Sequence, residues 1–354
     1  MMEVRIRKTF PPRPGGFRVD VEFQAGPGIS VLFGSEDAGK TLILEAIAGF
    51  VKPEDGRILL DDRIVFDAAA RVNLPPHARR CGYLFAGYGL FPHLTVRQNL
   101  TFAVKHRPRL ERHRRVNETV ERFRLEDCAG RRPAELSGSE RQRLAMARAL
   151  IGEPRVLLVD DPASGLEAPL RTELYDLLRQ ARADHDLPVL VATRRLEEGF
   201  ELADTVLVLR EGRLLQSGAP RALAERPASL EVARLLGISN LLAVEIVELD
   251  PQRNTSRVRW GEHWLSGPYF PGKLRGDRVW LCVCPDQLSA LPRQGKPGPN
   301  QAPLALLRAL ERPHSVRLEF AGEVAVELAR AEYERQKRNR EWLVEFPPQA
   351  LRVL

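Results

Sequence analysis

A glycine-rich segment that ends in lysine and threonine is the strongest chemical signal in this sequence. Residues 34–41 read Gly-Ser-Glu-Asp-Ala-Gly-Lys-Thr and match the pattern G-x-x-x-x-G-K-[ST]. Such a loop binds the phosphates of a nucleotide through its backbone amides and through the N-terminus of the helix that follows. We therefore predict that Lys40 contacts the β- and γ-phosphates and that the Thr41 hydroxyl is a ligand of Mg²⁺.

The whole loop and the residue after it are candidate nucleotide-binding positions. They are Gly34, Ser35, Glu36, Asp37, Ala38, Gly39, Lys40, Thr41 and Leu42. Glu36 and Asp37 are unusual at these places, because two carboxylates inside an anion-binding loop weaken nucleotide binding unless both point outward. The alternative interpretation is a chance Gly-Lys-Thr in a turn.

Two adjacent aspartates follow an apolar run. Val156–Val159 is Val-Leu-Leu-Val, and Asp160 and Asp161 come directly after it. A continuous aliphatic run of this kind is typical of a strand that is buried on both faces of a sheet. Together with the phosphate loop, it predicts that Asp160 holds the Mg²⁺ shell of the nucleotide. Taken alone, the segment equally fits a plain strand end followed by a turn.

A third segment lies between these two and predicts the start of a helix. Residues 136–143 read Leu-Ser-Gly-Ser-Glu-Arg-Gln-Arg, 22 residues before the aspartates. Ser137 or Ser139 can cap the helix, and free amides point outward at its start. The candidate nucleotide-binding residues here are Ser137, Gly138, Ser139 and Glu140. Without the flanking motifs, the segment indicates only a capped helix.

Strands and helices alternate over roughly the first 235 residues and position these motifs. We predict strands at Ile29–Phe33, Arg57–Leu60, Val156–Val159, Pro188–Ala192 and Thr205–Leu209, and helices at Thr41–Ala48, Glu140–Ile151 and Ala168–Ala183. The first residues of the chain also alternate like a strand. This order predicts a mostly parallel α/β sheet. The phosphate loop then lies between a strand and a helix, which is the context that it requires.

The pattern of apolar and polar residues changes after about residue 239, where the alternation typical of strands becomes dominant. We predict strands at Ala243–Leu249, Arg257–Trp260, Arg278–Cys284, Ser315–Phe320 and Glu323–Leu328. A short pattern also recurs after 62 residues, since Trp280-Leu281-x-x-x-Pro285-x-Gln287 returns as Trp342-Leu343-x-x-x-Pro347-x-Gln349. The sequence therefore predicts two domains, 1–238 and 239–354, the second a duplicated OB-like β domain.

Composition and charge exclude several classes of protein. Apolar residues make up 44% and charged residues 29%, which is ordinary for a globular chain. No run approaches the ~18 to 20 apolar residues that cross a bilayer, and no signal-peptide core is present, so we expect a cytoplasmic protein. The net charge of +7 comes without any nucleic-acid-binding motif, and we therefore expect no nucleic-acid partner.

Five ordered motifs besides the phosphate loop and the aspartates resemble those of ATP-binding cassette (ABC) transporter ATPases. Leu136–Glu140 resembles the family signature, and Phe91–Leu100 resembles the segment after the Q-loop. Ser164–Glu167 is similar to the D-loop, and Leu196–Asp204 to the helix after the switch residue. Val208–Arg213 resembles the closing strand and turn. The resemblance covers nearly all of residues 1–235.

Within that family the chain resembles the ATPases of molybdate and tungstate importers. Gly28 and Ile29, the segment Gly82–Phe85 and the segment Phe91–Leu100 carry this likeness. The tail resembles the duplicated Mop/TOBE domain of these proteins, although it lacks their Ser-x-Arg-Asn oxyanion motif. Importers of sulfate, other oxyanions and sugars are close alternatives.

The resemblance implies a fold, cofactors and partners. The fold is a P-loop NTPase cassette, with a helical subdomain at about residues 87–153, followed by a small all-β OB-like domain. The cofactors are ATP and Mg²⁺, with Thr41 and Asp160 as metal ligands. Two cassettes pair head to tail around two ATP molecules and drive a separate membrane permease. A periplasmic or extracellular binding protein brings the transported ion to this permease. The chain then lies peripherally on the inner face of the cell membrane.

Several positions depart from the family pattern. Ala86 stands where the family has the Q-loop glutamine, Asp161 replaces the catalytic glutamate, and Arg194 replaces the switch histidine. Ser139 replaces the second glycine of the signature, and Glu167 the last aspartate of the D-loop. We take Asp161 and Arg194 as the candidate catalytic residues and expect hydrolysis to be slow.

The function implied is the ATP-binding, energy-coupling subunit of an importer for molybdate or a related oxyanion. The alternative is a nucleotide-binding regulatory ABC-like protein with little or no hydrolysis, which the departures favour. A P-loop protein of DNA repair or translation is a third reading, but the long coiled insertions or tandem cassettes of those proteins are missing. Phe10, upstream of the phosphate loop, is a candidate for stacking on adenine, and an ordinary surface or core position is the alternative.

Overall fold

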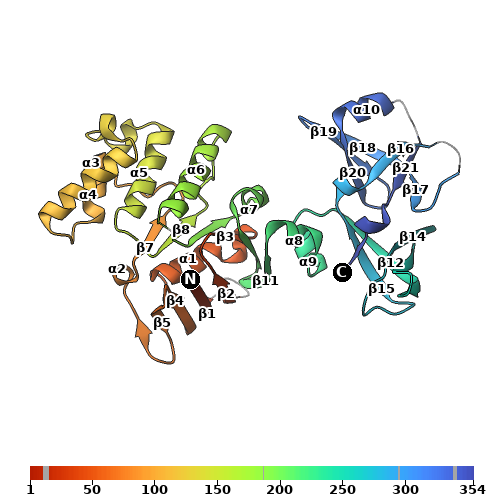
Figure 1. The fold of residues 1–354 in the computed structure, drawn as a ribbon, viewed down its shortest axis with the longest axis horizontal. Helices are drawn as coiled ribbons and strands as arrows, with labels where there is room; N and C mark the ends of the chain where they lie inside the picture. Colours follow the sequence, from red (N-terminus) through yellow and green to blue (C-terminus); the bar gives the residue numbers. More distant parts are fainter. Residues whose placement is uncertain (11–15, 186, 294–295, 338–340) are drawn as a thin grey trace. The chain divides into compact units, whose positions relative to one another are not determined.

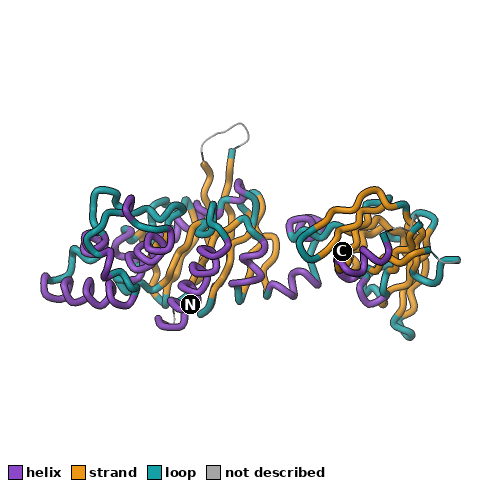
Figure 2. Tube along the Cα trace, turned by 90° about the horizontal axis from the view of Figure 1, so that it is seen from above, coloured by secondary structure: helices purple, strands orange, loops and turns teal. Residues whose placement is uncertain are grey.

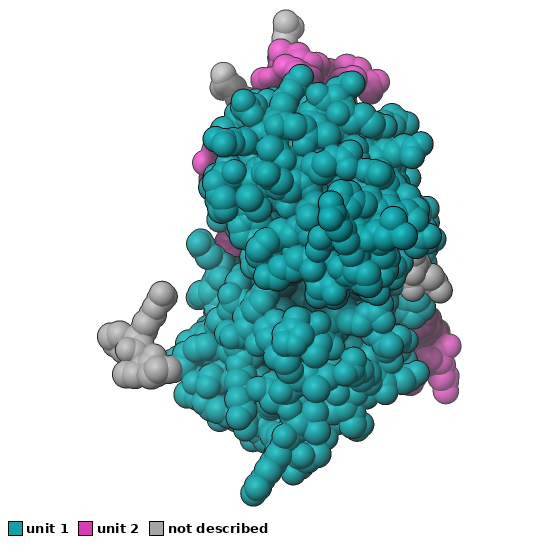
Figure 3. All heavy atoms as spheres, turned by 90° about the vertical axis from the view of Figure 1, so that its left-hand side faces the viewer, with its two compact units in different colours: residues 1–221 teal, residues 222–354 magenta. Residues whose placement is uncertain are grey.

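The chain divides into two compact units. A computed structural model describes residues 1–10, 16–185, 187–293, 296–337 and 341–354. The units are Met1–Arg221 and Ala222–Leu354, shown in different colours in Figure 3. The division falls within α8 (Pro220–Glu225), whereas the domain boundary predicted near residue 239 coincides with the start of β12 at Asn240. The difference arises because α8 and α9 (Leu230–Leu235) are helices with no strand-like alternation.

The first unit contains a sheet with the strand order β6-β5-β4-β1-β2-β11-β10-β3-β9-β8-β7. The strands are β1 (Met2–Phe10), β2 (Phe17–Ala25), β3 (Ile29–Phe33), β4 (Asp55–Leu60), β5 (Arg63–Asp67), β6 (Val72–Asn73), β7 (Cys81–Leu84), β8 (Val156–Asp160), β9 (Val189–Thr193), β10 (Thr205–Arg210) and β11 (Arg213–Gly218). All five strands predicted in this region, and the strand at the N-terminus, are present. Among the described residues, no helix is long and apolar enough to cross a membrane.

The sheet is mixed and not mostly parallel. Strands β10, β3, β9, β8 and β7 pair in parallel, and their continuous aliphatic runs are buried on both faces. Strands β1, β2, β4, β5 and β6 pair antiparallel and form an arm in which buried and exposed residues alternate along β1 and β2. The prediction of a mostly parallel sheet was wrong for this arm, because alternation shows that one face is buried but not which way the neighbour runs.

Seven helices are described between Lys40 and Leu202 in this unit. They are α1 (Lys40–Ala48), α2 (Pro76–Arg79), α3 (Val96–Ala103), α4 (Arg109–Arg122), α5 (Gly138–Leu150), α6 (Ala168–His185) and α7 (Leu196–Leu202). Helices α3, α4 and α5 pack together, away from the antiparallel arm, and lie between β7 and β8 in the chain (Figure 1). Helix α1 is buried in the core with Ile43, Leu44 and Ile47, beside Leu158 of β8.

The second unit is built mainly of strands (Figure 2), which pair antiparallel. Besides residues 222–225 of α8, helix α9 and helix α10 (Arg330–Gln336), the unit contains the strands β12 (Asn240–Asp250), β13 (Thr255–Trp260), β14 (His263–Pro268), β15 (Arg278–Val283), β16 (Ser289–Pro292), β17 (Gln301–Leu304), β18 (Leu306–Glu311), β19 (Ser315–Phe320), β20 (Val324–Ala329), β21 (Trp342–Glu345) and β22 (Arg352–Val353). They form three sheets, β14-β13-β12-β15-β22, β16-β21-β17 and β18-β19-β20. This small β domain is consistent with an OB-like fold.

The two copies of the short repeated pattern have the same local structure. Strand β15 is followed by the 3₁₀ turn Pro285–Gln287 and by β16, and β21 is followed by the turn Pro348–Ala350 and by β22. The last strand of each copy pairs with the other copy, β16 with β21 and β22 with β15. Exchange of strands between the copies gives them one shared core, which contains Leu281, Trp342 and Phe346.

The first unit is expected to fold without the second. The core around α1 takes its buried residues from Met2 to Leu209, and the core of the β domain takes its own from Leu242 to Leu351. A chain of residues 1–221 should therefore show the helical circular dichroism and the cooperative thermal unfolding of a folded cassette, with the full chain as the control. A random-coil spectrum for the truncated chain would contradict two independent cores.

Candidate nucleotide-binding site

The phosphate loop connects β3 to α1 through one tight turn. Strand β3 ends at Phe33, residues Glu36–Ala38 form a 3₁₀ turn, and α1 begins at Lys40. A Cβ on Gly34 would lie 2.3 Å from the carbonyl oxygen of Leu209, so the backbone approaches β10 too closely for any side chain. Gly39 has a φ of +86°, a conformation that glycine adopts without strain. Both glycines of the motif are therefore required by the fold of the loop.

The Lys40 side chain lies inside the loop. Its Nζ atom donates to the carbonyl oxygen of Gly34 at 2.9 Å and to that of Ser35 at 2.5 Å, and only 8% of the residue is exposed. Burial lowers the pKa of Lys40, and the carboxylates of Asp161 and Asp160 oppose this effect. An anionic phosphate is a stronger acceptor for an ammonium than a carbonyl oxygen is. The position suits the contact with phosphate that the motif predicts.

Thr41 and Asp160 meet at the end of strand β8. Thr41 Oγ1 donates to Asp160 Oδ1 at 2.9 Å. Burial raises the pKa of Asp160, which is 9% exposed, and the neighbouring carboxylate of Asp161 raises it further. A cation at this position would offset both effects. The donors are a hydroxyl and a carboxylate, the hard oxygen ligands that Mg²⁺ prefers, and so these two residues fit the metal.

The two acidic residues of the loop point into solvent. Glu36 and Asp37 are both exposed, and Ser35 Oγ donates to Asp37 Oδ1 at 2.5 Å. This hydrogen bond lowers the pKa of Asp37 and keeps it charged. Solvent screens an exposed carboxylate strongly, so these two charges oppose an anion in the loop much less than buried ones would.

The structure brings the two candidate catalytic residues to the edge of the loop. Asp161 has a φ of +39°, its amide donates to the Ala192 carbonyl at 2.8 Å, and its buried Oδ1 atom has no hydrogen-bond partner among the described residues. Arg194 follows β9, and its Nη1 atom lies 3.8 Å from Glu36 Oε2. Ala86 lies after β7 and is exposed. Its methyl group offers no polar contact.

Three further residues lie at this site that sequence reasoning missed. Burial raises the pKa values of Glu45 and Tyr83, and the nearby charge of Asp160 adds to both shifts. Glu45 is four residues after Thr41 on α1, a helical spacing that could have indicated it. Phe17 lies against Gly39, since a Cβ there would be 2.9 Å from its ring. Phe17 is also paired with the adenine candidate Phe10, with ring centroids 6.3 Å apart.

The signature segment begins helix α5, as predicted, and Ser137 is its cap. Ser137 Oγ accepts from the Glu140 amide at 3.2 Å, and the Ser137 amide donates to Glu140 Oε2 at 2.7 Å. Ser139 Oγ donates to Glu173 Oε1 on α6 at 2.6 Å. Among the described residues, no hydrogen bond or ion pair joins this segment to residues 34–41. The signature segment and the phosphate loop are therefore not joined directly within one chain.

Fold and site together define a P-loop nucleotide-binding protein of the ATP-binding cassette type. The ABC transporter family matches residues 18–164. The molybdate/tungstate import ATP-binding protein WtpC of Archaeoglobus fulgidus is 39% identical over 241 residues, which are 68% of this chain and 96% of that protein. The chain belongs to the ABC transporter ATP-binding protein family.

In two other relatives, the matched region is a smaller part of the relative's own length. The molybdenum import ATP-binding protein ModC of Paramagnetospirillum magneticum is 38% identical over 227 residues, 64% of this chain and 61% of that protein. The spermidine/putrescine import ATP-binding protein PotA of Oleidesulfovibrio alaskensis is 38% identical over 277 residues, 76% of this chain and 71% of that protein. The chain thus matches less than two thirds of ModC.

A solved structure has the same cassette fold. It is a dimeric post-hydrolysis state of an ATP-binding cassette bound to ADP and Pi, with a TM-score of 0.53 and 23% identity. The match covers 62% of this chain and 99% of that one. This chain is therefore similar to known cassettes in the arrangement of its strands and helices as well as in its sequence motifs.

Proposed function

We propose that the chain is the ATP-binding, energy-coupling subunit of an importer for molybdate or a related oxyanion. The observation that carries the proposal is the meeting of Lys40, Thr41 and Asp160 in one loop-and-strand site of an ABC fold. The substrate class is supported by relatives whose names state molybdenum or molybdate/tungstate import. A relative named for spermidine/putrescine import is of similar identity, so the cassette alone does not determine the cargo.

Each residue of the site has a definite role in this proposal. The backbone amides of residues 34–41 hold the phosphates, and Lys40 moves from two carbonyl oxygens to the β- and γ-phosphates. Thr41 and Asp160 would hold Mg²⁺, and the ion would supply positive charge that offsets the charge of the phosphates. Asp161 accepts the proton of the attacking water through its unpartnered Oδ1 atom. Arg194 can only donate, so it steadies negative charge on the γ-phosphate.

A second copy completes the site. Ser137, Gly138, Ser139 and Glu140 lie at the partly exposed start of a helix, and no described hydrogen bond or ion pair joins them to the loop of their own chain. Free amide groups at a helix N-terminus attract phosphate. We propose that two cassettes pair head to tail, so that this segment of one copy faces the phosphate loop of the other. The dimeric cassette of the same fold supports this arrangement.

The partner in the membrane docks in a groove of the first unit. The groove has a volume of about 930 Å³ and is lined by the aromatic residues Tyr83, Phe85, Phe91 and Phe102. Lys105 and Arg148 also line it, with Lys105 Nζ 4.4 Å from the centre of the Phe102 ring. Among the described residues, no aspartate or glutamate lines the groove. An apolar floor with a basic rim suits a permease segment that carries apolar and acidic side chains.

The partners and the location follow from the same proposal. The permease is a separate polypeptide, and a periplasmic or extracellular binding protein delivers the oxyanion to it. The cassette then lies on the inner face of the membrane. The alternative function, a nucleotide-binding regulatory protein with little hydrolysis, is favoured by Ala86, Asp161 and Arg194, which weaken the catalytic set.

Transport of a labelled cargo tests the proposal. In cells that lack their own molybdate ATPase, we expect the chain, expressed together with a molybdate permease, to support uptake of labelled molybdate. Lys105→Glu should lower this uptake about tenfold, since like charges across a docking surface repel, while leaving ATP binding unchanged. The control is Arg253→Glu, the same charge reversal at a side chain that is 84% exposed in the β domain. Uptake of spermidine in place of molybdate would contradict the proposed cargo.

A further inference from the structure

Ser139, which stands where the family signature has glycine, is tied to helix α6. Its hydroxyl donates to Glu173 Oε1 at 2.6 Å, so the hydroxyl is directed toward the body of its own cassette. Arg143, one helical turn after Ser139 on α5, lies on the same face and has its Nε atom 3.7 Å from the same carboxylate oxygen. One carboxylate thus binds two groups of the helix that starts with the signature.

A second contact lies one turn away on α6. A Cβ on Gly138 would lie 2.8 Å from Leu170 Cδ1, so the backbone of the signature turn packs directly on this leucine. Leu170 and Glu173 are three residues apart and share one face of α6. The start of α5 is therefore seated on α6 by a close backbone approach and by a charged hydrogen bond.

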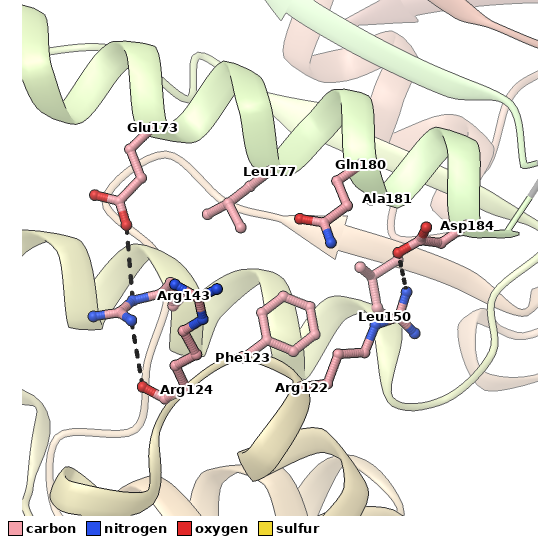
Figure 4. A pocket seen from close by; sticks show the side chains of 10 residues that line it. All are labelled: Arg122, Phe123, Arg124, Arg143, Leu150, Glu173, Leu177, Gln180, Ala181 and Asp184. Carbon is pink, nitrogen blue, oxygen red and sulfur yellow. Dashed lines mark hydrogen bonds and ion pairs between the residues drawn. The ribbon is translucent and has the colours of Figure 1, made fainter.

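Figure 4 shows Glu173 and Arg143 at one end of a cavity of about 250 Å³ between α6, α5 and the end of α4. Arg143 bridges Glu173 and the Arg124 carbonyl oxygen, which accepts from Arg143 Nη1 at 3.3 Å. At the other end, Arg122 Nη2 donates to Asp184 Oδ2 at 2.6 Å. Polar contacts at both ends of this cavity thus connect α6 to α5 and to the end of α4.

We propose that Glu173 is a positioning residue that fixes the signature turn for the nucleotide of the opposing cassette. The inference depends on the proposed function, in which Ser137–Glu140 completes the site of a second copy. Helix α6 follows strand β8, which ends at Asp160 just before Asp161, so Glu173 also links the signature to this strand of its own chain. The Ser139 hydroxyl is occupied by this carboxylate and serves orientation, not direct contact with phosphate.

Three variants separate this role from direct binding. Ser139→Ala and Glu173→Ala both remove the hydrogen bond, and each should raise the ATP concentration for half-maximal hydrolysis about five- to tenfold, as expected for loss of a hydrogen bond to a charged group. Glu173→Gln keeps an acceptor for the hydroxyl and should stay within about twofold of the parent. The double variant Ser139→Ala/Glu173→Ala should be no worse than Glu173→Ala alone, because Glu173→Ala already removes the one hydrogen bond that Ser139→Ala removes.

Binding to the isolated cassette is the second readout. Titration of each variant with a fluorescent ATP analogue at a protein concentration below dimerisation should give the parental affinity, because the phosphate loop is unchanged. A variant that lowers the maximal rate and the melting temperature while the half-saturating ATP concentration stays parental would show a merely structural role and overturn the proposal. A defect in Ser139→Ala without one in Glu173→Ala would assign the hydroxyl to direct phosphate contact and overturn it as well.

Mixed dimers test whether Glu173 acts across the interface. When Glu173→Ala is mixed with an excess of Lys40→Ala, most Glu173→Ala chains pair with a Lys40→Ala chain. In this mixed dimer the one working phosphate loop belongs to the Glu173→Ala chain, and it faces the intact signature of the Lys40→Ala chain. We expect this dimer to hydrolyse ATP with the parental half-saturating concentration. A concentration that stays raised would place the defect within the same cassette and overturn the inference. A parent that binds Mg-ATP but neither dimerises nor hydrolyses it would instead contradict the proposed function, and the role of Glu173 with it.

Discussion

Lys40→Ala should lower the affinity for Mg-ATP about 100-fold or more, because each hydrogen bond from a charged donor contributes about 1.5–3 kcal/mol. The Lys40 ammonium is buried in the loop, where water cannot replace it, and its two acceptors are the carbonyls that shape the loop. Its removal also takes away a cation that interacts with the carboxylates of Asp161 and Asp160. Isothermal titration calorimetry with the purified full chain measures the change.

Lys52→Ala is the matched control for this experiment. Lys52 lies just after α1 and is exposed, so its replacement removes the same charge outside the loop. The melting temperature of Lys52→Ala should stay close to that of the parent, whereas Lys40→Ala should lower it because the carbonyl oxygens of Gly34 and Ser35 lose their donor. Titrations are therefore made well below the melting temperature of Lys40→Ala. Equal affinities for the parent and Lys40→Ala would show that the nucleotide site is misassigned.

The second large effect is a gain of activity. The parent should hydrolyse ATP slowly, and Asp161→Glu combined with Ala86→Gln and Arg194→His should raise steady-state phosphate release at least about tenfold, since general-base catalysis contributes ~10²- to 10⁴-fold. Asp161 is one methylene shorter than glutamate, so its carboxylate ends short of the water that a glutamate would reach. The exposed Ala86 cannot orient that water, and a guanidinium cannot accept a proton.

Single variants show which position limits turnover. Asp161→Glu alone should give the largest part of the gain, because it restores the reach of the general base. Arg194→His alone should give less and can even lower the rate, because it removes a cation that steadies the γ-phosphate. The affinity for ATP, measured separately, should change little in all variants. A triple variant no faster than the parent would exclude these three positions as the limit on hydrolysis.

The antiparallel arm shows why pairing could not be predicted from sequence. The alternation along β1 indicates a strand with one buried face, and β1 is such a strand. Which strand it pairs with, and in which direction, depends on segments far away in the chain, since β1 pairs with β2 and β4. The same holds for the β domain, where β22 crosses to β15 of the other copy of the pattern.

Features that depend on short-range order could be predicted from the sequence alone. The Gly34–Thr41 loop, the buried strands β3, β8 and β9 and the Ser137 cap each need only a few neighbouring residues of the right type. Tertiary structure alone decided which distant groups meet. Phe17 against Gly39, Tyr83 beside Asp160 and Glu173 bonded to Ser139 join residues 22, 77 and 34 positions apart. Sequence spacing carries no signal for such contacts, because packing of whole strands and helices creates them.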